Sequence, residues 1–204
     1  MMHDPAALSA IEAAAAALAR GELVAFPTET FYGLAANALD PRAVDRLCGL
    51  KGRDPSKPIP CIVGDRGQIA RLSADWPETA ERLCNRFWPG PLTLVLPARP
   101  ELPAPLRPTG WVGFRLSAHP WARALALTLG APITSTSANP AGGREVSHVA
   151  DLDPILLRDL AYVLDAGPTP GGAPSTVVRV GPAGLSCLRP GPIPFEDVQA
   201  ALLG

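Results

Sequence analysis

Four short segments of the sequence place hydroxyl groups or cations beside glycine or proline. They are residues 27–34, 51–53, 135–139 and 175–178. Each follows or lies within an apolar run of strand length, so a sheet could bring all four to one edge. Hydroxyl groups, backbone N–H groups and cations together are suited to carboxylate or phosphate oxygens. The sequence therefore predicts one anion-binding pocket built from distant segments.

The cations of the second segment have two interpretations. Lys51 and Arg53 come at the end of a predicted helix, where positive charge is favourable without any ligand. The loop that follows adds a third cation, Lys57, among prolines. Arginine offers a bidentate fork to phosphate, lysine a point charge, and glycine a close backbone approach. The third cation favours a phosphate-binding loop over simple helix-end charges.

Two further arginines lie in or at the end of predicted strands. Arg115 interrupts the apolar run 111–116, where burial without a partner would be costly, so it either faces solvent or meets an anion. Arg189 ends another predicted strand at a Pro-Gly turn. Each arginine alone is compatible with a surface position or with a ligand.

The two hydroxyl-rich segments are equally open to two interpretations. Residues 135–139 and the glycines after them offer hydroxyl and N–H donors to an anion, or form a polar turn capped by Asn139. Residues 27–34 are an anion site or the cap of a helix.

The sequence shows no pair of a nucleophile and a general base, since His119 precedes a predicted helix and His148 has no evident partner. Catalysis by positioning and charge neutralisation is therefore favoured over covalent catalysis.

Composition and motifs exclude several classes of protein. The sequence has no GxxxxGK[ST], GxGxxG, HExxH or GxSxG motif, which removes the P-loop, Rossmann, zincin and hydrolase-elbow interpretations. Its four cysteines and three histidines show no zinc-ligand spacing. The net charge of −1 gives no general attraction to nucleic acid. Unpaired cysteines are typical of reduced, cytosolic proteins, so we expect a cytoplasmic location. Without a signal peptide or an apolar run near ~20 residues, we expect no membrane association.

Alternating apolar patterns predict the elements that hold these segments. An Asp-Pro pair predicts the start of three helices, over 4–20, from Pro41 and from Pro154. Further helices are expected over 65–72, 77–87, 120–129 and 194–203. Strands are expected over 23–26, 59–63, 92–96, 111–116, 132–135, 161–164, 176–180 and 185–188. The pattern predicts an α+β fold with α/β-like layers, a twisted mixed parallel/antiparallel sheet of about seven strands with helices on both faces. We expect one domain over residues 1–204.

Six motifs occur in a fixed order over residues 20–192. They are Pro27-Thr28-Glu29-Thr30-x-Tyr32-Gly33-Leu34, Lys51-Gly52-Arg53, Phe87-Trp88-Pro89-Gly90-Pro91-Leu92-Thr93, Ser137-Ala138-Asn139, Pro174-Ser175-Thr176-Val177-Val178 and Leu188-Arg189-Pro190-Gly191. In this order they resemble the YrdC-like L-threonylcarbamoyladenylate synthase family, in its short, single-domain form.

The resemblance implies a cytoplasmic nucleotidyltransferase with the YrdC-like fold. Such an enzyme condenses L-threonine, bicarbonate and ATP to threonylcarbamoyl-AMP and pyrophosphate, with Mg²⁺ accompanying ATP. A separate threonylcarbamoyl transferase complex then modifies the adenosine at position 37 of tRNA. The resemblance also allows direct binding of tRNA or double-stranded RNA.

Residue roles are implied by the matching motif positions. The resemblance implies that threonine is bound by Thr30, Arg115, Ser135 and Ser175. It implies that ATP is bound by Arg53, Lys57, Ser137 and Arg189. The resemblance also implies a catalytic centre formed by Lys51, Arg53, Ser137 and Asn139. No protein side chain is implied as a metal ligand, since the phosphates of ATP would hold Mg²⁺.

Four positions depart from the family pattern. Ile62 stands in place of a histidine near threonine, Trp111 in place of a small polar residue near the nucleotide, and Pro174 in place of a glutamate. Glu145 adds an acidic group near the nucleotide.

Two alternative functions stay open. One is a catalytically silent module of the same fold that binds double-stranded RNA, and the other is a relative that uses carbamoyl-AMP with another acceptor.

Overall fold

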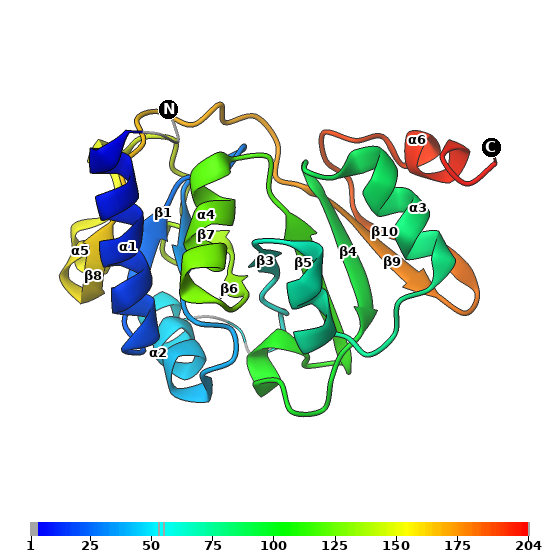
Figure 1. The fold of residues 1–204 in the computed structure, drawn as a ribbon, viewed down its shortest axis with the longest axis horizontal. Coiled ribbons are helices and arrows are strands. Elements are labelled where there is room, and N and C mark those ends of the chain that lie inside the picture. The colour runs from blue at the N-terminus through cyan, green and yellow to red at the C-terminus, as the bar shows by residue number, and fades with distance from the viewer. Residues whose placement is uncertain (1–3, 53, 55, 204) are drawn as a thin grey trace.

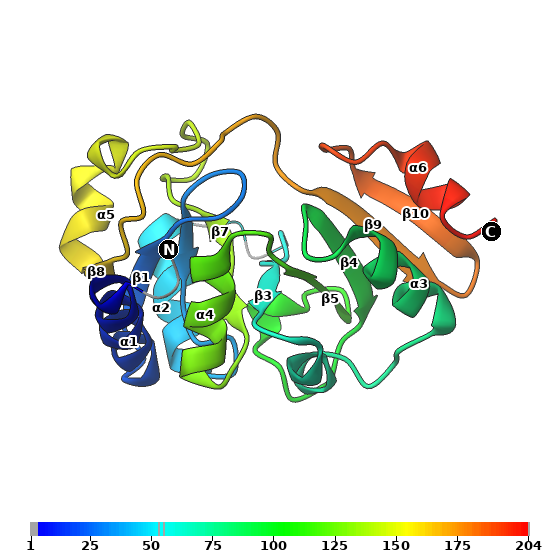
Figure 2. The same cartoon turned by 45° about the horizontal axis from the view of Figure 1, so that its top comes forward.

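The computed structural model describes residues 4–52, 54 and 56–203. Within these ranges the strands form two sheets, one of four strands in the order β7-β2-β1-β8 and one of six in the order β10-β9-β4-β5-β3-β6. The two sheets occupy opposite halves of the molecule (Figure 1). The segment between β8 and β9 passes from one half to the other (Figure 2). In the described part of the chain, no helix has the length and apolar character needed to span a bilayer.

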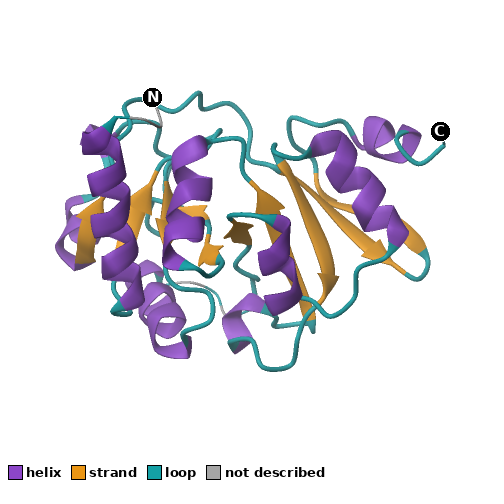
Figure 3. Ribbon diagram, in the orientation of Figure 1, coloured by secondary structure: helices purple, strands orange, loops and turns teal. Residues whose placement is uncertain are grey.

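The four-stranded sheet has helices on both faces. It contains β7 (Thr136–Ser137), β2 (Gly33–Ala35), β1 (Leu23–Phe26) and β8 (Leu160–Val163). Val24 and Phe26 of β1 pack with α1 (Pro5–Ala19) and α4 (Pro120–Leu129), which lie side by side over the near face in Figure 3. The alternate residues Leu23 and Ala25 share a cluster with residues of α2 (Pro41–Lys51) and α5 (Pro154–Asp159). Successive strand residues point to opposite faces, so both faces are apolar.

The six-stranded sheet has one apolar face and one polar face. Its strands are β10 (Gly184–Arg189), β9 (Thr176–Gly181), β4 (Leu92–Pro97), β5 (Trp111–Leu116), β3 (Cys61–Val63) and β6 (Ile133–Thr134). Leu94 and Phe114 on the apolar face belong to one cluster with Leu83 of α3 (Glu78–Phe87). The 3-10 helix η1 (Arg66–Arg71) contributes Ile69 to the same cluster. The opposite face is free to form a binding site.

The remaining elements are short. They are η2 (Ala104–Leu106), η3 (Val149–Asp151) and α6 (Phe195–Ala200).

The ends of the main helices follow the sequence signals. The side chains of Asp4, Asp40, Asp153 and His119 each accept a hydrogen bond from the backbone N–H two residues later. A proline occupies the first helical position after each of these caps, as the sequence predicts. Gly130 ends α4 with a φ of 69°. The stretch predicted as a helix over 65–72 is instead a 3-10 helix.

The mixed α+β class is confirmed, whereas the single sheet of about seven strands is replaced by ten described strands in two sheets. The strands that sequence patterns missed or merged are very short: β2 has three residues, and β6 and β7 have two each. Such lengths are too short for a period of two to be detected. β4 and β5 pair antiparallel, as do β9 and β10, whereas β3 and β5 pair parallel, which confirms the predicted mixture of strand directions.

Candidate functional site

A cavity of about 350 Å³ lies where the two sheets meet. The chain crosses from β6 in one sheet to β7 in the other within five residues, and Ser135 is the residue between these strands. Its backbone N–H donates to Pro60 O at 2.7 Å, which holds the crossing against the segment before β3. The hydroxyl of Ser135 lines the cavity together with Thr30, from the loop between β1 and β2.

The floor of the cavity is the polar face of the six-stranded sheet. Val95 of β4 lies opposite Gly113 of β5 on one side and opposite Arg179 of β9 on the other. The alternating pattern therefore places Trp111, Gly113 and Arg115 in one row on this face. A Cβ at Gly113 would lie 3.3 Å from Thr93 Cγ2. The absence of a side chain at this position therefore leaves space in the middle of the cavity floor. Trp111 and Arg115 are four residues apart, about 13 Å along the strand.

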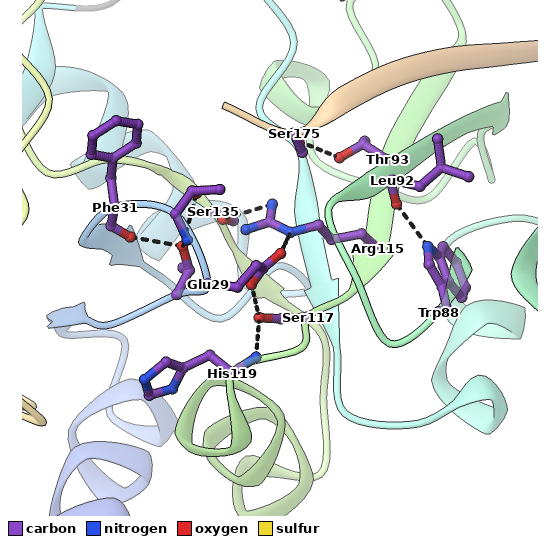
Figure 4. Close-up of polar contacts among 12 residues, drawn as sticks. Glu29, Phe31, Trp88, Leu92, Thr93, Arg115, Ser117, His119, Ser135 and Ser175 are labelled. Atoms are coloured by element: carbon purple, nitrogen blue, oxygen red, sulfur yellow. Dashed lines mark hydrogen bonds and ion pairs between the residues drawn. The ribbon is translucent and has the colours of Figure 1, made fainter. Parts of the chain in front are cut away.

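Arg115 is held at one end of this floor by a buried ion pair. Its Nε donates to Glu29 Oε1 at 2.9 Å, and the two side chains are 6% and 12% exposed. The hydroxyl of Ser117 donates to Glu29 Oε2, and Ser117 Oγ accepts from the N–H of His119 at 3.1 Å (Figure 4). Arg115 Nη1 lies 3.5 Å from Ser135 Oγ. Arg115 is therefore paired inside the cavity and does not face solvent.

Electrostatics keep Glu29 ionised. Burial by itself raises the pKa of this carboxyl, but the charge of Arg115 and the hydrogen bond from Ser117 bring the pKa below its usual value of 4.5. His119, the cap of α4, has a pKa lowered by burial, an effect that the nearby Glu29 opposes. At neutral pH the guanidinium of Arg115, which lines the cavity, is therefore paired with a charged carboxylate.

Ser175 joins a second arginine to the floor. Its carbonyl oxygen accepts from Arg189 Nε at 3.1 Å and from Nη2 at 2.8 Å. The Ser175 hydroxyl lies 2.8 Å from Thr93 Oγ1 and 3.1 Å from Arg189 Nη2. The pKa of Arg189 is lowered by burial and by the positive charge of Arg115, while Glu145 acts in the opposite direction. Two guanidinium groups thus lie in one cavity, which favours an anionic ligand.

Gly191 is expected to be essential for this arrangement. A Cβ there would lie 2.4 Å from Thr176 N and 2.5 Å from Pro174 O, so Gly191→Ala must push the Ser175 backbone out of place. We expect a loss of about 1–3 kcal/mol in the free energy of unfolding, measured with urea. Gly49 on α2 is the control, because nothing lies within 4 Å of a Cβ there. Gly49→Ala should be neutral or stabilising, and equal losses in both variants would contradict the prediction.

Lys51 contacts Ser137 of β7 but does not itself line the cavity. It is the last residue of α2 and is 5% exposed, and its Nζ donates to the carbonyl oxygen of Ser137 and lies 3.5 Å from Ser137 Oγ. The helix-end explanation is therefore insufficient, since the ammonium group makes a tertiary contact. Ser137 lines the cavity, so the positive charge of Lys51 lies one residue away from any ligand bound there.

Asn139 organises the turn that follows. Its Nδ2 donates to Pro140 O at 2.9 Å and to Gly143 O at 2.6 Å. Among the described residues its buried Oδ1 has no hydrogen-bond partner. The polar-turn interpretation of this segment is thus correct for Asn139, while Ser135 and Ser137 face the cavity.

The far end of the cavity combines an aromatic ring with a cation. Arg179 Cζ lies 5.0 Å from the centroid of the Trp111 ring, and both residues line the cavity. Arg179 Nε is buried without a hydrogen-bond partner within the described ranges. Glu145 and Pro174 also line the cavity, whereas Ile62 packs in the apolar core with α1 and α4. Three of the four departures from the family pattern therefore line the cavity, and Ile62 does not.

The structure brings most of the predicted site residues together. Six line the cavity: Thr30, Arg115, Ser135, Ser137, Ser175 and Arg189. Lys51 and Asn139 lie in the layer behind it. Lys57 is exposed and is not among the lining residues, although its neighbour Pro58 is. Arg53 lies outside the described residues.

Sequence reasoning missed Glu29, Arg179 and Thr93. Glu29 lies in the segment 27–34, for which the sequence predicts either an anion site or a helix cap without a separate role for this residue. Residues 27–32 are not helical, and Thr28 Oγ1 accepts from Thr30 N at 3.1 Å. Arg179 and Thr93 lie in strands whose pairing the sequence does not specify. A cation among valines in residues 177–180 nevertheless indicates a strand with one polar face, on which Arg179 could meet a ligand. Over the described ranges, no group of three or more His, Cys, Asp or Glu could hold a metal ion.

Comparison with a family model and with known sequences relates the chain to one family. Residues 16–191 match the family model of the Sua5, YciO and YrdC proteins, which carries the description "Telomere recombination". A threonylcarbamoyl-AMP synthase of Bacillus subtilis is 41% identical over 198 residues, which is 94% of this chain and 56% of that protein. A putative threonylcarbamoyl-AMP synthase of Methanocaldococcus jannaschii is 32% identical over 87% of this chain and 84% of its own length.

Among solved structures, the crystal structure of Pyrococcus abyssi Sua5 complexed with L-threonine superposes with a TM-score of 0.86. It is 37% identical and covers 94% of this chain, which in turn covers 57% of that protein. The chain thus spans a little more than half the length of the Bacillus and Pyrococcus proteins.

Proposed function

The chain belongs to the Sua5, YciO and YrdC family, and from this premise we propose that it is an L-threonylcarbamoyladenylate synthase. The proposed reaction condenses L-threonine, bicarbonate and ATP to threonylcarbamoyl-AMP and pyrophosphate. The relatives named above as threonylcarbamoyl-AMP synthases support this activity, as does the likeness to a protein crystallised with L-threonine.

The main support within the molecule is a single cavity with two chemically different ends. Arg115, Ser135 and Ser175 surround one end, which suits the carboxylate and hydroxyl of a small amino acid. Trp111 and Arg179 form the other end, which suits a nucleobase and phosphate. One sheet face supports both ends, so an amino acid and a nucleotide bound there would meet in the middle.

In the proposed reaction the amine nitrogen of threonine forms a bond to the carbon of carbon dioxide and loses a proton, giving a carbamate. With bicarbonate the same N–C bond forms, a C–O bond of bicarbonate breaks, and the oxygen leaves as water. A carbamate oxygen then attacks the α-phosphorus of ATP, and the bond to the bridging oxygen breaks to release pyrophosphate. Two anions meet in this step, so Lys51, Arg115 and Arg189 would lower their repulsion. Mg²⁺ would enter with ATP as part of the substrate.

Trp111 is expected to contribute to nucleotide affinity. Base–aromatic stacking is worth roughly 1–3 kcal/mol, so Trp111→Ala should raise the KM for ATP about 10-fold. The KM for threonine should change far less, because Arg115 lies at the other end of the floor. Trp111→Phe keeps an aromatic face and serves as the matched control. Equal rises in both KM values for Trp111→Ala would contradict the assignment of this end to the nucleotide.

The remaining proposals concern the surroundings of the reaction. We propose a cytoplasmic location and the supply of threonylcarbamoyl-AMP to a separate transferase complex that modifies position 37 of tRNA. Arg53, Lys57 and Asn139 are proposed as further contributors to ATP binding or catalysis. Contact with tRNA or double-stranded RNA would need a local cationic surface, since the net charge is −1.

The test is detection of threonylcarbamoyl-AMP by mass spectrometry, with pyrophosphate release measured in parallel. The purified protein receives ATP, Mg²⁺, bicarbonate and either L-threonine or L-serine. Threonine-dependent product is the expected result. Pyrophosphate release without dependence on threonine would point to another acceptor of a carbamoyl group. Salt-sensitive binding of double-stranded RNA without any turnover would identify a silent RNA-binding module.

A further inference from the structure

A carboxylate lies directly against Arg115, which lines a cavity suited to anions. Glu29 follows Thr28 in the loop between β1 and β2, and its side chain is 12% exposed. Its pair with Arg115 makes that end of the cavity neutral before any ligand binds. An acidic group that weakens the attraction for an anionic ligand needs a compensating role, and the geometry of its contacts indicates one.

Both oxygens of Glu29 are held by different donors. Oε1 accepts from Arg115 Nε at 2.9 Å, and Oε2 accepts from the hydroxyl of Ser117. Ser117 is fully buried, and its Oγ accepts from His119 N at the start of α4. Ser117 therefore links the carboxylate to the start of α4 and gives it a second anchor besides Arg115 (Figure 4).

The arrangement determines which edge of Arg115 faces a ligand. Glu29 contacts only the Nε side of the guanidinium, because its second oxygen is used by Ser117. Within the described part of the chain, the Nη atoms have a single hydrogen bond, the long one of 3.5 Å from Nη1 to Ser135 Oγ. The pair of Nη donors can therefore bind a carboxylate through two parallel hydrogen bonds.

We infer that Glu29 is a positioning residue for amino-acid recognition, fixing the guanidinium plane of Arg115 so that its Nη edge receives the substrate carboxylate. This inference rests on the proposed function, since it takes L-threonine as the ligand at this end of the cavity. Glu29 acts through Arg115 and does not touch the reacting atoms. The nucleotide end, near Trp111, should be independent of it.

The test compares binding of L-threonine and of ATP to the full chain by calorimetry. Glu29→Gln keeps the shape of the side chain but removes its charge, and we expect L-threonine affinity to fall about 10- to 100-fold. The ATP affinity should stay within about twofold, since the nucleotide end makes no contact with Glu29. Glu29→Asp keeps the charge on a shorter side chain and should recover part of the affinity. The kcat at saturating L-threonine should change less than the KM.

Two further variants separate positioning from a general effect on the fold. In the Arg115→Ala background, adding Glu29→Gln should cause no further loss of L-threonine affinity, because the group through which Glu29 acts is gone. Ser117→Ala removes the partner of Oε2 without leaving a charge unpaired, and should weaken L-threonine binding in the same direction. The control is Glu81→Gln, which breaks an exposed ion pair of 2.6 Å with Arg66 and should leave both affinities unchanged.

The outcomes distinguish this inference from the proposed function. Equal L-threonine affinities of wild type, Glu29→Gln and Ser117→Ala would overturn the positioning role alone, as would additive losses in the Arg115→Ala background. Failure of the wild type itself to bind L-threonine would overturn the proposed function and the positioning role together.

Discussion

Replacement of Arg115 by alanine is expected to weaken L-threonine binding about 100-fold or more, because a charged hydrogen bond contributes roughly 1.5–3 kcal/mol and the guanidinium offers a pair of them. ATP affinity should change much less, since Trp111 and Arg179 lie at the other end of the cavity. Calorimetric titration with each substrate measures the two effects separately. Equal losses for L-threonine and ATP would show that Arg115 does not recognise the amino acid.

The same substitution should also destabilise the fold, because it leaves the carboxylate of Glu29 buried without its partner. Breaking a buried ion pair in this way costs about 3–5 kcal/mol. In the wild type the pKa of Glu29 is lowered, so the pair stabilises the fold above pH 4.5 and this contribution is lost as pH falls through the lowered pKa. Without Arg115, burial dominates and raises that pKa, so stability increases as pH falls.

The difference in stability between wild type and Arg115→Ala should therefore be largest near neutral pH and should shrink as pH approaches 4.5. Urea unfolding at several pH values measures it. Arg66→Ala is the matched control, because it breaks an ion pair with Glu81 whose two side chains are each 40% exposed. An exposed pair contributes about 0–1 kcal/mol, so this variant should show a small loss. A loss for Arg115→Ala that does not vary with pH would contradict the role given to Glu29.

Replacement of Lys51 by methionine is expected to reduce kcat/KM for ATP about 100- to 1,000-fold, the range seen when one preorganised donor is removed from a reacting anion. The ammonium group lies 3.5 Å from the hydroxyl of Ser137, which lines the cavity, so its charge is close to the place where two anions would meet in the proposed reaction. Methionine keeps most of the buried stem of lysine, which limits the effect on packing. Pyrophosphate release at fixed L-threonine concentration measures the rate.

Arg46 provides the control for Lys51, since it is an exposed cation on the same helix. Arg46→Met removes the same charge from α2 without changing the cavity, and its rate should match that of the wild type. A rate for Lys51→Met within about tenfold of the wild type would assign Lys51 a structural role at the end of α2.

Sequence patterns were most informative where the physical signal is local. The Asp-Pro starts at Asp4, Asp40 and Asp153 specified three helices, because a cap and its first turn lie within four residues of one another. Apolar runs of four to six residues likewise identified the central strands, such as β4 and β5. Ser135, however, could be interpreted as a turn residue or as a ligand, because nothing local shows that the chain changes sheets there.

The sequence by itself determined the fold class, the ordered family motifs and the hydroxyl and cationic residue types available to the cavity. Tertiary structure alone decided which of them meet: Arg115 and Glu29 are 86 residues apart in sequence, as are Lys51 and Ser137. It also placed Arg179 over Trp111 and buried Ile62 away from the cavity. The physical reason is that pairing across a sheet depends on register and burial, which are properties of the assembled strands, whereas caps and periodicity depend only on neighbours in the chain.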